Sequence, residues 1–232
     1  MDFKKLNFMQ QIGFITGIEK EALILKKTYN YTESEIIWTN MDPDRAYTQA
    51  KKLVKDGYST IISFGFSAAL DPNLAAGDLV LPTTVVDTAG RIFPTDVILH
   101  KKMKNHFSQK FSTVNGTVFG SDKIIWEANE KKQIFDIYSA TTVDMESLGI
   151  AKAAKESGCS FLIVRAISDT ASQNLPMKSL KSITVTGRIK IINIIWNLLT
   201  NLNESSDMLK LALNSRKAQT RLHEVARFGF GI

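Results

Sequence analysis

Three acidic residues, Glu21, Glu146 and Asp169, each come just after a predicted strand. Taken singly, each acid also suits the first turn of a helix, where a negative charge stabilises the helix dipole. Taken together, three carboxyl groups can divide the acid, base and binding roles that cleavage of a glycosidic bond requires. We therefore consider these three acids as the candidate chemical centre.

Other kinds of site find less support in the sequence. The glycines of residues 13–17 do not form a dinucleotide fingerprint, and we find neither a phosphate-binding P-loop nor a G-x-S-x-G elbow. His100, His106 and His223 are scattered over predicted helices, and Cys159 is the single cysteine. Because no metal-ligand spacing results, we expect no metal and no cofactor, with phosphate as co-substrate only if the reaction is a phosphorolysis.

The hydrophobic pattern predicts the elements that must position these acids. Strands are expected at 12–16, 35–39, 59–64, 79–82, 114–119, 141–143 and 160–167. Helices are expected at 19–27, 42–57, 95–107, 127–135, 145–157, 178–201 and 205–227. Residues 65–72, rich in small side chains, are predicted as a loop.

This alternation predicts an α/β fold: a single three-layer domain with a mixed, mostly parallel sheet flanked by helices. We assign residues 11–202 to this domain and residues 203–232 to a C-terminal helical extension of it. In such sheets ligands bind beyond the carboxyl ends of the strands, which is where the three acids fall.

Length and composition agree with one ordinary globular domain. The chain has 232 residues, of which 44% are hydrophobic and 22% charged, and its one cysteine cannot form an internal disulfide. The formal charge is +6, and residues 178–232 carry all of the excess, with nine Lys or Arg residues against three acids. A basic chain can bind nucleic acid, a membrane surface or an acidic partner, but no nucleic-acid-binding motif is present.

Five short blocks resemble the nucleoside phosphorylase/nucleosidase superfamily in order and spacing, most closely the branch with methylthioadenosine/S-adenosylhomocysteine nucleosidases. They are IGFITGIEKE at 12–21, SFG at 63–65, GD at 77–78, VDME at 143–146 and RAISD at 165–169. Finer features are similar to the hopanoid-associated phosphorylases, which remove adenine from adenosylhopane. These lie at 63–72, 90–96, 120–122 and 209–222. The resemblance to the superfamily spans residues 11–176, and a chance match of all five blocks is improbable.

The resemblance assigns a role to each matching acid. It implies that Asp169 protonates the purine at N7, that Glu146 binds the ribose hydroxyls and that Glu21 orients the attacking water. Because adenine is a poor leaving group until it is protonated, we expect Asp169 to start protonated or to share a proton in a desolvated pocket.

Further binding residues follow from the same resemblance. Ser168 is expected to help hold the base, Met145 to pack on the ribose, and Ile124 and Ile125 to contact the adenine. The loop beginning at Gly65 and Phe66 is expected to place backbone N–H groups near the reacting carbon, where water or phosphate could sit.

Hydrolysis and phosphorolysis remain alternatives at this point. Phosphorylases of the superfamily generally bring an arginine and a serine to the phosphate, whereas the corresponding loop positions here are Ser63 and Phe66. No arginine lies near Gly17, where Glu21 occupies the turn, and a carboxylate there would repel phosphate. We therefore favour a hydrolase acting on adenosylhopane.

The rival interpretations are methylthioadenosine/S-adenosylhomocysteine hydrolysis, a phosphate-dependent phosphorylase and a catalytically silent nucleoside-binding protein. The partners we expect are a small nucleoside and, as the superfamily implies, a second copy of the chain in a homo-oligomer such as a dimer. We expect a cytoplasmic protein without a signal peptide. A further hypothesis is that the basic C-terminal helices touch anionic lipid at the inner face of the bacterial membrane.

Overall fold

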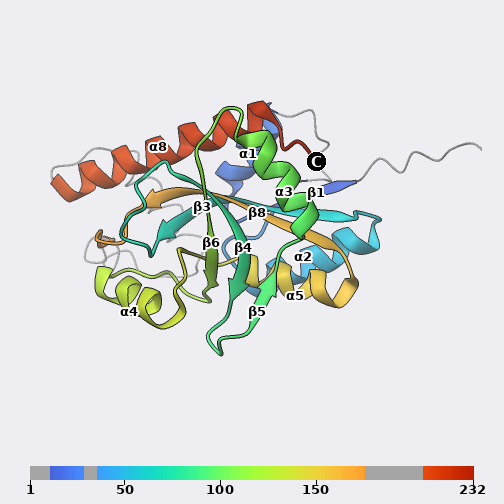
Figure 1. The fold of residues 1–232 in the computed structure, drawn as a ribbon, viewed down its shortest axis with the longest axis horizontal. Coiled ribbons are helices and arrows are strands. Elements are labelled where there is room, and N and C mark those ends of the chain that lie inside the picture. Colours follow the sequence, from blue (N-terminus) through green and yellow to red (C-terminus); the bar gives the residue numbers. More distant parts are fainter. Residues whose placement is uncertain (1–10, 29–35, 176–205) are drawn as a thin grey trace, which may run out of the picture.

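The computed structural model describes residues 11–28, 36–175 and 206–232, and within them one eight-stranded mixed sheet carries helices on both faces (Figure 1). The strands are β1 Ile12–Thr16, β2 Ile36–Trp38, β3 Thr60–Ala69, β4 Leu79–Val86, β5 Ile92–Pro94, β6 Thr113–Gly120, β7 Thr142–Asp144 and β8 Ser160–Asp169. The helices are α1 Glu19–Thr28, α2 Pro43–Lys55, α3 Val97–Phe107, α4 Ala128–Tyr138, α5 Ser147–Ser157 and α8 Ser206–Phe228. The predicted fold class is confirmed.

Five of the strands pair in a closed ring. β3 pairs with β8, β8 with β4, β4 with β6, β6 with β7, and β7 with β3. β1 and β2 extend the sheet in parallel from β3, and β5 pairs antiparallel with β4. The carboxyl ends of β1, β3 and β8, which run parallel, therefore meet at one edge, and β7 leads into the same region.

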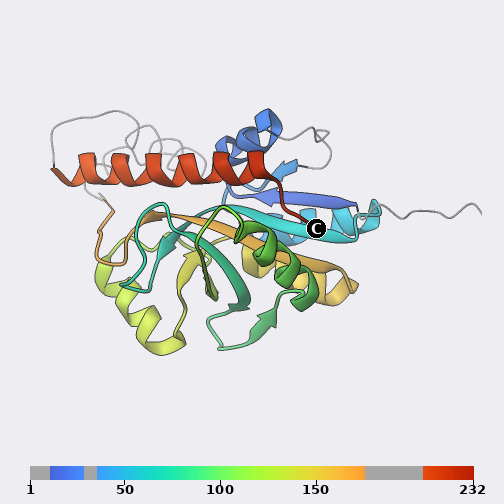
Figure 2. The same cartoon turned by 45° about the horizontal axis from the view of Figure 1, so that its top comes forward.

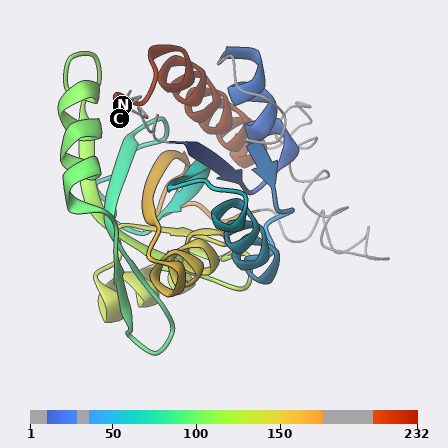
Figure 3. The same ribbon diagram turned by 90° about the vertical axis from the view of Figure 1, so that its right-hand side faces the viewer.

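The helices bury two apolar faces of the sheet. α1, α3 and α8 cover one face, where Phe14, Phe64, Phe107 and Phe230 are wholly or almost wholly buried. α2 and α5 pack together on the other (Figure 3). The start of α2 follows the predicted capping pattern, because the Asp42 carboxylate accepts hydrogen bonds from two backbone N–H groups and a proline opens the helix.

The sheet differs from the prediction in two details. β3 continues to Ala69, so most of the loop expected at 65–72 is strand, because β8 and β7 pair with this small-residue stretch. The short strand β5 was not expected. The helix predicted at 178–201 lies outside the described residues.

The helix predicted at 205–227 corresponds to α8. It lies lengthwise over the sheet against β8, with α1 beside its C-terminal end (Figure 2). Leu211, Leu222 and Val225 are buried beneath it, whereas Lys210, Arg216, Lys217 and Arg227 are exposed. The apolar stripe of α8 therefore belongs to the core, and most of its charge faces solvent. None of the helices in the described segments is long and apolar enough to cross a membrane.

Candidate active site

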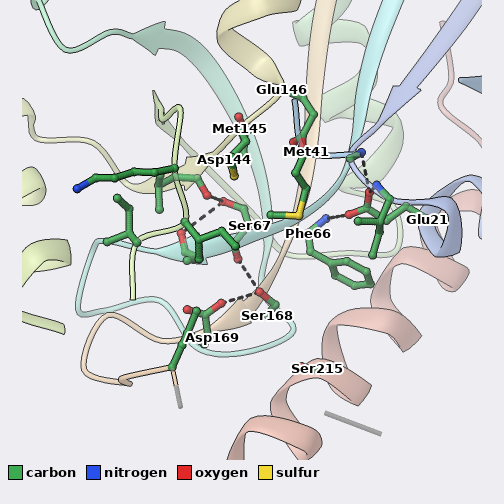
Figure 4. Close-up of a pocket in the computed structure, with 18 of the residues that line it drawn as sticks. Glu21, Met41, Phe66, Ser67, Asp144, Met145, Glu146, Ser168, Asp169 and Ser215 are labelled. Atoms are coloured by element: carbon green, nitrogen blue, oxygen red, sulfur yellow. Dashed lines mark hydrogen bonds between the residues drawn. The ribbon is translucent and has the colours of Figure 1, made fainter. Parts of the chain in front are cut away.

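A pocket opens at the carboxyl ends of β1, β3, β7 and β8 (Figure 4). It brings together every site residue predicted from the sequence except Gly65. The predicted residues that line it are Glu21, Phe66, Ile124, Ile125, Met145, Glu146, Ser168 and Asp169. Other lining residues were not predicted, among them Gly17, Met41, Ser67, Asp144, Leu175, Leu211 and Ser215. The last two come from α8, so this helix forms part of the wall.

Backbone groups of three residues hold the Glu21 carboxylate in place. Its carboxylate accepts hydrogen bonds from the N–H groups of Gly17 at 2.8 Å and Ile18 at 2.9 Å, and from Phe66 at 2.7 Å. Burial raises the pKa of Glu21 to about 7, although these hydrogen bonds and the charge of Arg165 oppose the rise. A carboxyl group with a pKa near neutrality is suited to accept a proton from a nucleophile.

Gly65 has a different role from the one expected. It lies within β3, and a side-chain carbon there would overlap the Glu21 carboxylate. The neighbouring Phe66 N–H group, expected to lie near the reacting carbon, donates its hydrogen bond to the same carboxylate. Glycine at position 65 is therefore required for close approach, and it allows α1 to bring Glu21 against β3.

Glu146 shares a buried cluster with one arginine. It lies at the N-terminal end of α5, 5% exposed, and its Oε2 is 3.7 Å from Nη2 of Arg165. Arg165, 1% exposed on β8, is hydrogen-bonded to Asp144 through Nε at 2.8 Å and to Ser63 Oγ through Nη2 at 2.6 Å. Asp144 on β7 and Glu146 at the start of α5 therefore both lie against the guanidinium group of Arg165, and the charge of Glu21 on α1 also acts on it.

The charge balance of this cluster perturbs its carboxyl groups. Burial, followed by the negative charge of Asp144, raises the pKa of Glu146 to about 8, with a further contribution from Glu21. Arg165 only partly offsets this rise, while the surrounding carboxylates raise the pKa of Arg165 against the effect of burial. Two acids with pKa values near neutrality in one pocket mark it as a candidate active site.

Asp169 lies on the other side of the pocket, where its surroundings differ. Its Oδ1 accepts a hydrogen bond from Ser168 Oγ at 2.7 Å, and its Oδ2 lies 2.5 Å from Nζ of Lys131. Lys131 comes from α4 and is 0% exposed. The expected partner Ser168 is therefore in contact with Asp169, and a buried lysine is added.

Sequence reasoning missed three charged members of this site. Arg165 and Asp144 lie inside blocks that we singled out, and an arginine within a strongly apolar strand could have been recognised as a buried partner for acids. Lys131 gave no such indication, because α4 carries two adjacent lysines and resembles a surface helix. Within the described segments, no group of three or more His, Cys, Asp or Glu residues could hold a metal ion.

Comparison with known proteins adds a family match. Residues 40–199 match the model of a family described as the Phosphorylase superfamily. The chain is similar to a 5'-methylthioadenosine/S-adenosylhomocysteine nucleosidase of Buchnera aphidicola subsp. Acyrthosiphon pisum (strain Tuc7), 24% identical over 213 residues, which cover 75% of this chain and 91% of the relative. The nucleosidase of the same name from Listeria welshimeri is 29% identical over 203 residues, covering 70% and 87%.

Solved structures share the fold. A 5'-methylthioadenosine/S-adenosylhomocysteine nucleosidase from Neisseria meningitidis, in complex with methylthio-immucillin-A, has a TM-score of 0.68 at 16% identity, covering 94% of this chain and 99% of that chain. The futalosine hydrolase of Helicobacter pylori has a TM-score of 0.65 at 16% identity, covering 81% and 97%.

Proposed function

This chain belongs to the phosphorylase superfamily, and on that premise we propose that it is a nucleosidase that hydrolyses the N-glycosidic bond of a 5'-substituted adenosine and releases adenine. The observation that carries the proposal is that Glu21, Glu146 and Asp169, from separate parts of the chain, line one pocket. The named relatives are nucleosidases, which supports purine nucleoside cleavage.

The leaving group is handled by Asp169. Breaking the bond between C1' and N9 leaves an electron pair on the purine, and protonation at N7 stabilises it. Asp169 provides the proton, and the Ser168 hydroxyl, 2.7 Å from its Oδ1, orients the carboxyl group. Ile124 and Ile125, also in the wall, provide apolar contact for the flat base.

The ribose is bound beside Glu146. As the bond breaks, positive charge develops on the sugar ring, and nearby carboxylates stabilise that charge. Glu146 accepts hydrogen bonds from the ribose hydroxyls, and the adjoining Met145 packs on the ring. Substrate hydroxyls give the buried Glu146 carboxylate the hydrogen-bond donors that a charge without access to water requires.

The nucleophile is water rather than phosphate. Glu21, with its pKa of about 7, accepts the proton of the water as the oxygen attacks C1'. Arg165 and Ser63 do lie together, as an anion site would need, but the Asp144 carboxylate already pairs with the arginine and neutralises its charge. A phosphate dianion would therefore find no uncompensated positive charge on Arg165.

Two kinds of 5' substituent are candidates, a hopane chain and a thioether, and each is favoured by a different observation. The sequence blocks resemble hopanoid-associated phosphorylases, which favours adenosylhopane, whereas the named relatives favour methylthioadenosine or S-adenosylhomocysteine. Met41, Phe66 and Leu211 provide apolar wall for either group. Adenosylhopane remains our leading substrate, because the sequence blocks resemble the family that acts on it and Leu211 of α8 adds apolar surface to the wall.

Adenine release distinguishes these possibilities. Purified protein is incubated with adenosylhopane, methylthioadenosine or S-adenosylhomocysteine, each with and without phosphate. We expect adenine and a free ribosyl product at a rate independent of phosphate. A requirement for phosphate, with a ribose 1-phosphate product, would make the chain a phosphorylase. Absence of adenine from all three nucleosides would contradict the proposed function.

Contact with a membrane and self-association complete the proposal. Lys210, Arg216 and Lys217 are exposed on α8 near the exposed Leu209 and Leu213, a combination suited to anionic lipid headgroups. We expect flotation with anionic liposomes that falls when the three cations are replaced by glutamine. Unchanged flotation contradicts the contact. Sedimentation equilibrium tests the expected dimer.

A further inference from the structure

Lys131 is a buried cation whose hydrogen bonds converge on the proposed acid. Its Nζ donates to Asp169 Oδ2 at 2.5 Å, to the Thr170 carbonyl oxygen at 2.9 Å and to the Gln173 carbonyl oxygen at 3.0 Å. All three donors of the ammonium group are thereby used. Among the ion pairs of the described residues, Asp169 is the partner of Lys131, so the pair is balanced one to one.

The neighbouring lysine shows that this burial is specific. Lys132 follows Lys131 on α4, but its side chain is 70% exposed and pairs with Asp136 one turn along the helix. Lys131 has no exposed surface. A lysine is fully buried at high cost unless a partner and hydrogen bonds compensate, so the site as a whole is built to hold a charged or proton-exchanging pair.

Both oxygens of Asp169 already accept hydrogen bonds in this structure, Oδ1 from Ser168 and Oδ2 from Lys131. A carboxylate that only accepts hydrogen bonds has no proton to give to a purine. A protonated Asp169 must therefore obtain its proton from a neighbour or from solvent. The ammonium group of Lys131 is the closest source, and it is shielded from water by its burial.

We propose that Lys131 supplies the proton that Asp169 passes to the purine, which makes it a residue that acts through Asp169; the inference rests on the proposed function. The Nζ–H bond of Lys131 breaks and a proton binds Asp169 Oδ2, leaving a neutral amine and a neutral carboxyl group. Where water does not solvate the two charges, this neutralisation is least costly.

In the remaining steps every proton and electron pair is accounted for. The Asp169 carboxyl group gives a proton to N7, the electron pair of the C1'–N9 bond goes to N9, and the hydroxide part of water binds C1' while Glu21 takes the other proton. After adenine leaves, Glu21 returns its proton to solvent, and Asp169, which lines the emptied pocket, takes up a proton from solvent and passes it to Lys131. No oxidant, reductant or further reactant is needed.

The test separates proton delivery from folding by means of the leaving group. 4-Nitrophenolate leaves without protonation, so the 4-nitrophenyl glycoside of the same 5-substituted ribose needs no acid. We compare Lys131→Met, Asp169→Asn and the double variant with the control Lys132→Met, which removes the exposed lysine from the same helix. Adenine and 4-nitrophenol release are measured for each, together with thermal unfolding.

We expect Lys131→Met to lower kcat for adenine release by about 10²-fold, the lower end of the usual contribution of an acid, and to change nitrophenol release less than threefold. The double variant should release adenine no more slowly than Asp169→Asn alone, because Lys131 acts through that residue. Lys132→Met should match the wild type on both substrates.

Three results would overturn the inference while the wild type still releases adenine. They are adenine release by Lys131→Met within threefold of wild type, equal losses on both glycosides, and additive losses in the double variant. Equal losses would indicate that Lys131 only supports the structure. Failure of the wild-type protein to release adenine from any 5'-substituted adenosine would instead contradict the proposed function.

Discussion

The two sides of the pocket bury acids in opposite electrostatic surroundings. On the nucleophile side, Glu21, Glu146 and Asp144 share the positive charge of Arg165, and burial raises the pKa values of both glutamates. On the leaving-group side, Asp169 and Lys131 form a one-to-one ion pair among the described residues. The excess of carboxyl groups suits a side that must take up a proton. The balanced pair suits a side that must give a proton away.

The largest effects should come from replacing the acid of each side, Glu21 or Asp169, and comparing adenine with 4-nitrophenol as the leaving group. Glu21→Gln should lower release of both adenine and 4-nitrophenol by about 10²–10⁴-fold, because both need an activated water. Asp169→Asn should lower adenine release by a similar factor and leave nitrophenol release near wild type, while the protein stays folded. Equal behaviour of the two variants, or near-normal adenine release by Asp169→Asn, would show that the sides are not divided in this way.

Replacing Arg165 tests whether the buried carboxyl groups on the nucleophile side depend on its positive charge. Arg165→Met leaves Asp144 and Glu146 buried without their counter-charge, so the free energy of unfolding should fall by about 3–5 kcal/mol. The matched control is Lys132→Met, whose side chain is 70% exposed and pairs with Asp136, itself 52% exposed. That variant should lose less than about 1 kcal/mol. Urea denaturation of both variants provides the comparison, and equal small losses would contradict it.

The raised pKa of Glu21 also predicts a pH dependence of stability. The folded protein holds this proton up to about pH 7, whereas the unfolded chain releases it near pH 4.5, so stability falls as pH rises between these values. Because Gln does not titrate, the stability of Glu21→Gln relative to wild type should rise by up to about 3 kcal/mol from pH 4.5 to pH 7.5.

The control for this pH series is Glu156→Gln. Glu156 is on the surface, and its hydrogen bond from Tyr47 lowers its pKa, so its effect has the opposite sign. Its contribution is fully present above the unfolded pKa and is lost as pH falls. Denaturant titrations at several pH values measure both series. A flat difference for Glu21→Gln would mean that its carboxyl group titrates normally in the folded protein.

The acids of both sides could be predicted from the sequence, but the buried lysine of the leaving-group side could not. Glu21, Glu146 and Asp169 could be found because each follows an apolar strand, and strand ends meet in an α/β fold. Lys131 could not, because its burial depends on where β8 ends and on the carbonyl oxygens of Thr170 and Gln173. A local pattern predicts an element and its polar ends. It does not predict which charged side chain of a surface-like helix is buried.

The fold shows the same limit at β3. The small residues from Gly65 to Ala69 have the composition of a loop, and they form strand only because β8 and β7 lie on either side. Pairing between distant segments decided this conformation, as it often does for strands. The consequence reaches the site, since the strand brings the Phe66 N–H group to the Glu21 carboxylate.

The smallest effect we expect lies within the leaving-group side itself. Ser168→Ala removes the hydroxyl that donates to Asp169 Oδ1 and leaves the Lys131 contact with Oδ2 in place. Loss of one hydrogen bond to a charged group costs about 1.5 kcal/mol, so adenine release should fall about tenfold. Release of 4-nitrophenol should not change.

The matched control is Ser172→Ala, at an exposed position of the following loop, which should behave as wild type. If Ser168→Ala were as damaging as Asp169→Asn, the hydroxyl itself would be transferring the proton, and Asp169 would not be the acid that protonates the purine with a proton from Lys131. A tenfold effect confined to adenine keeps Ser168 as the group that orients Asp169 and leaves proton supply to the Lys131 side of the carboxylate.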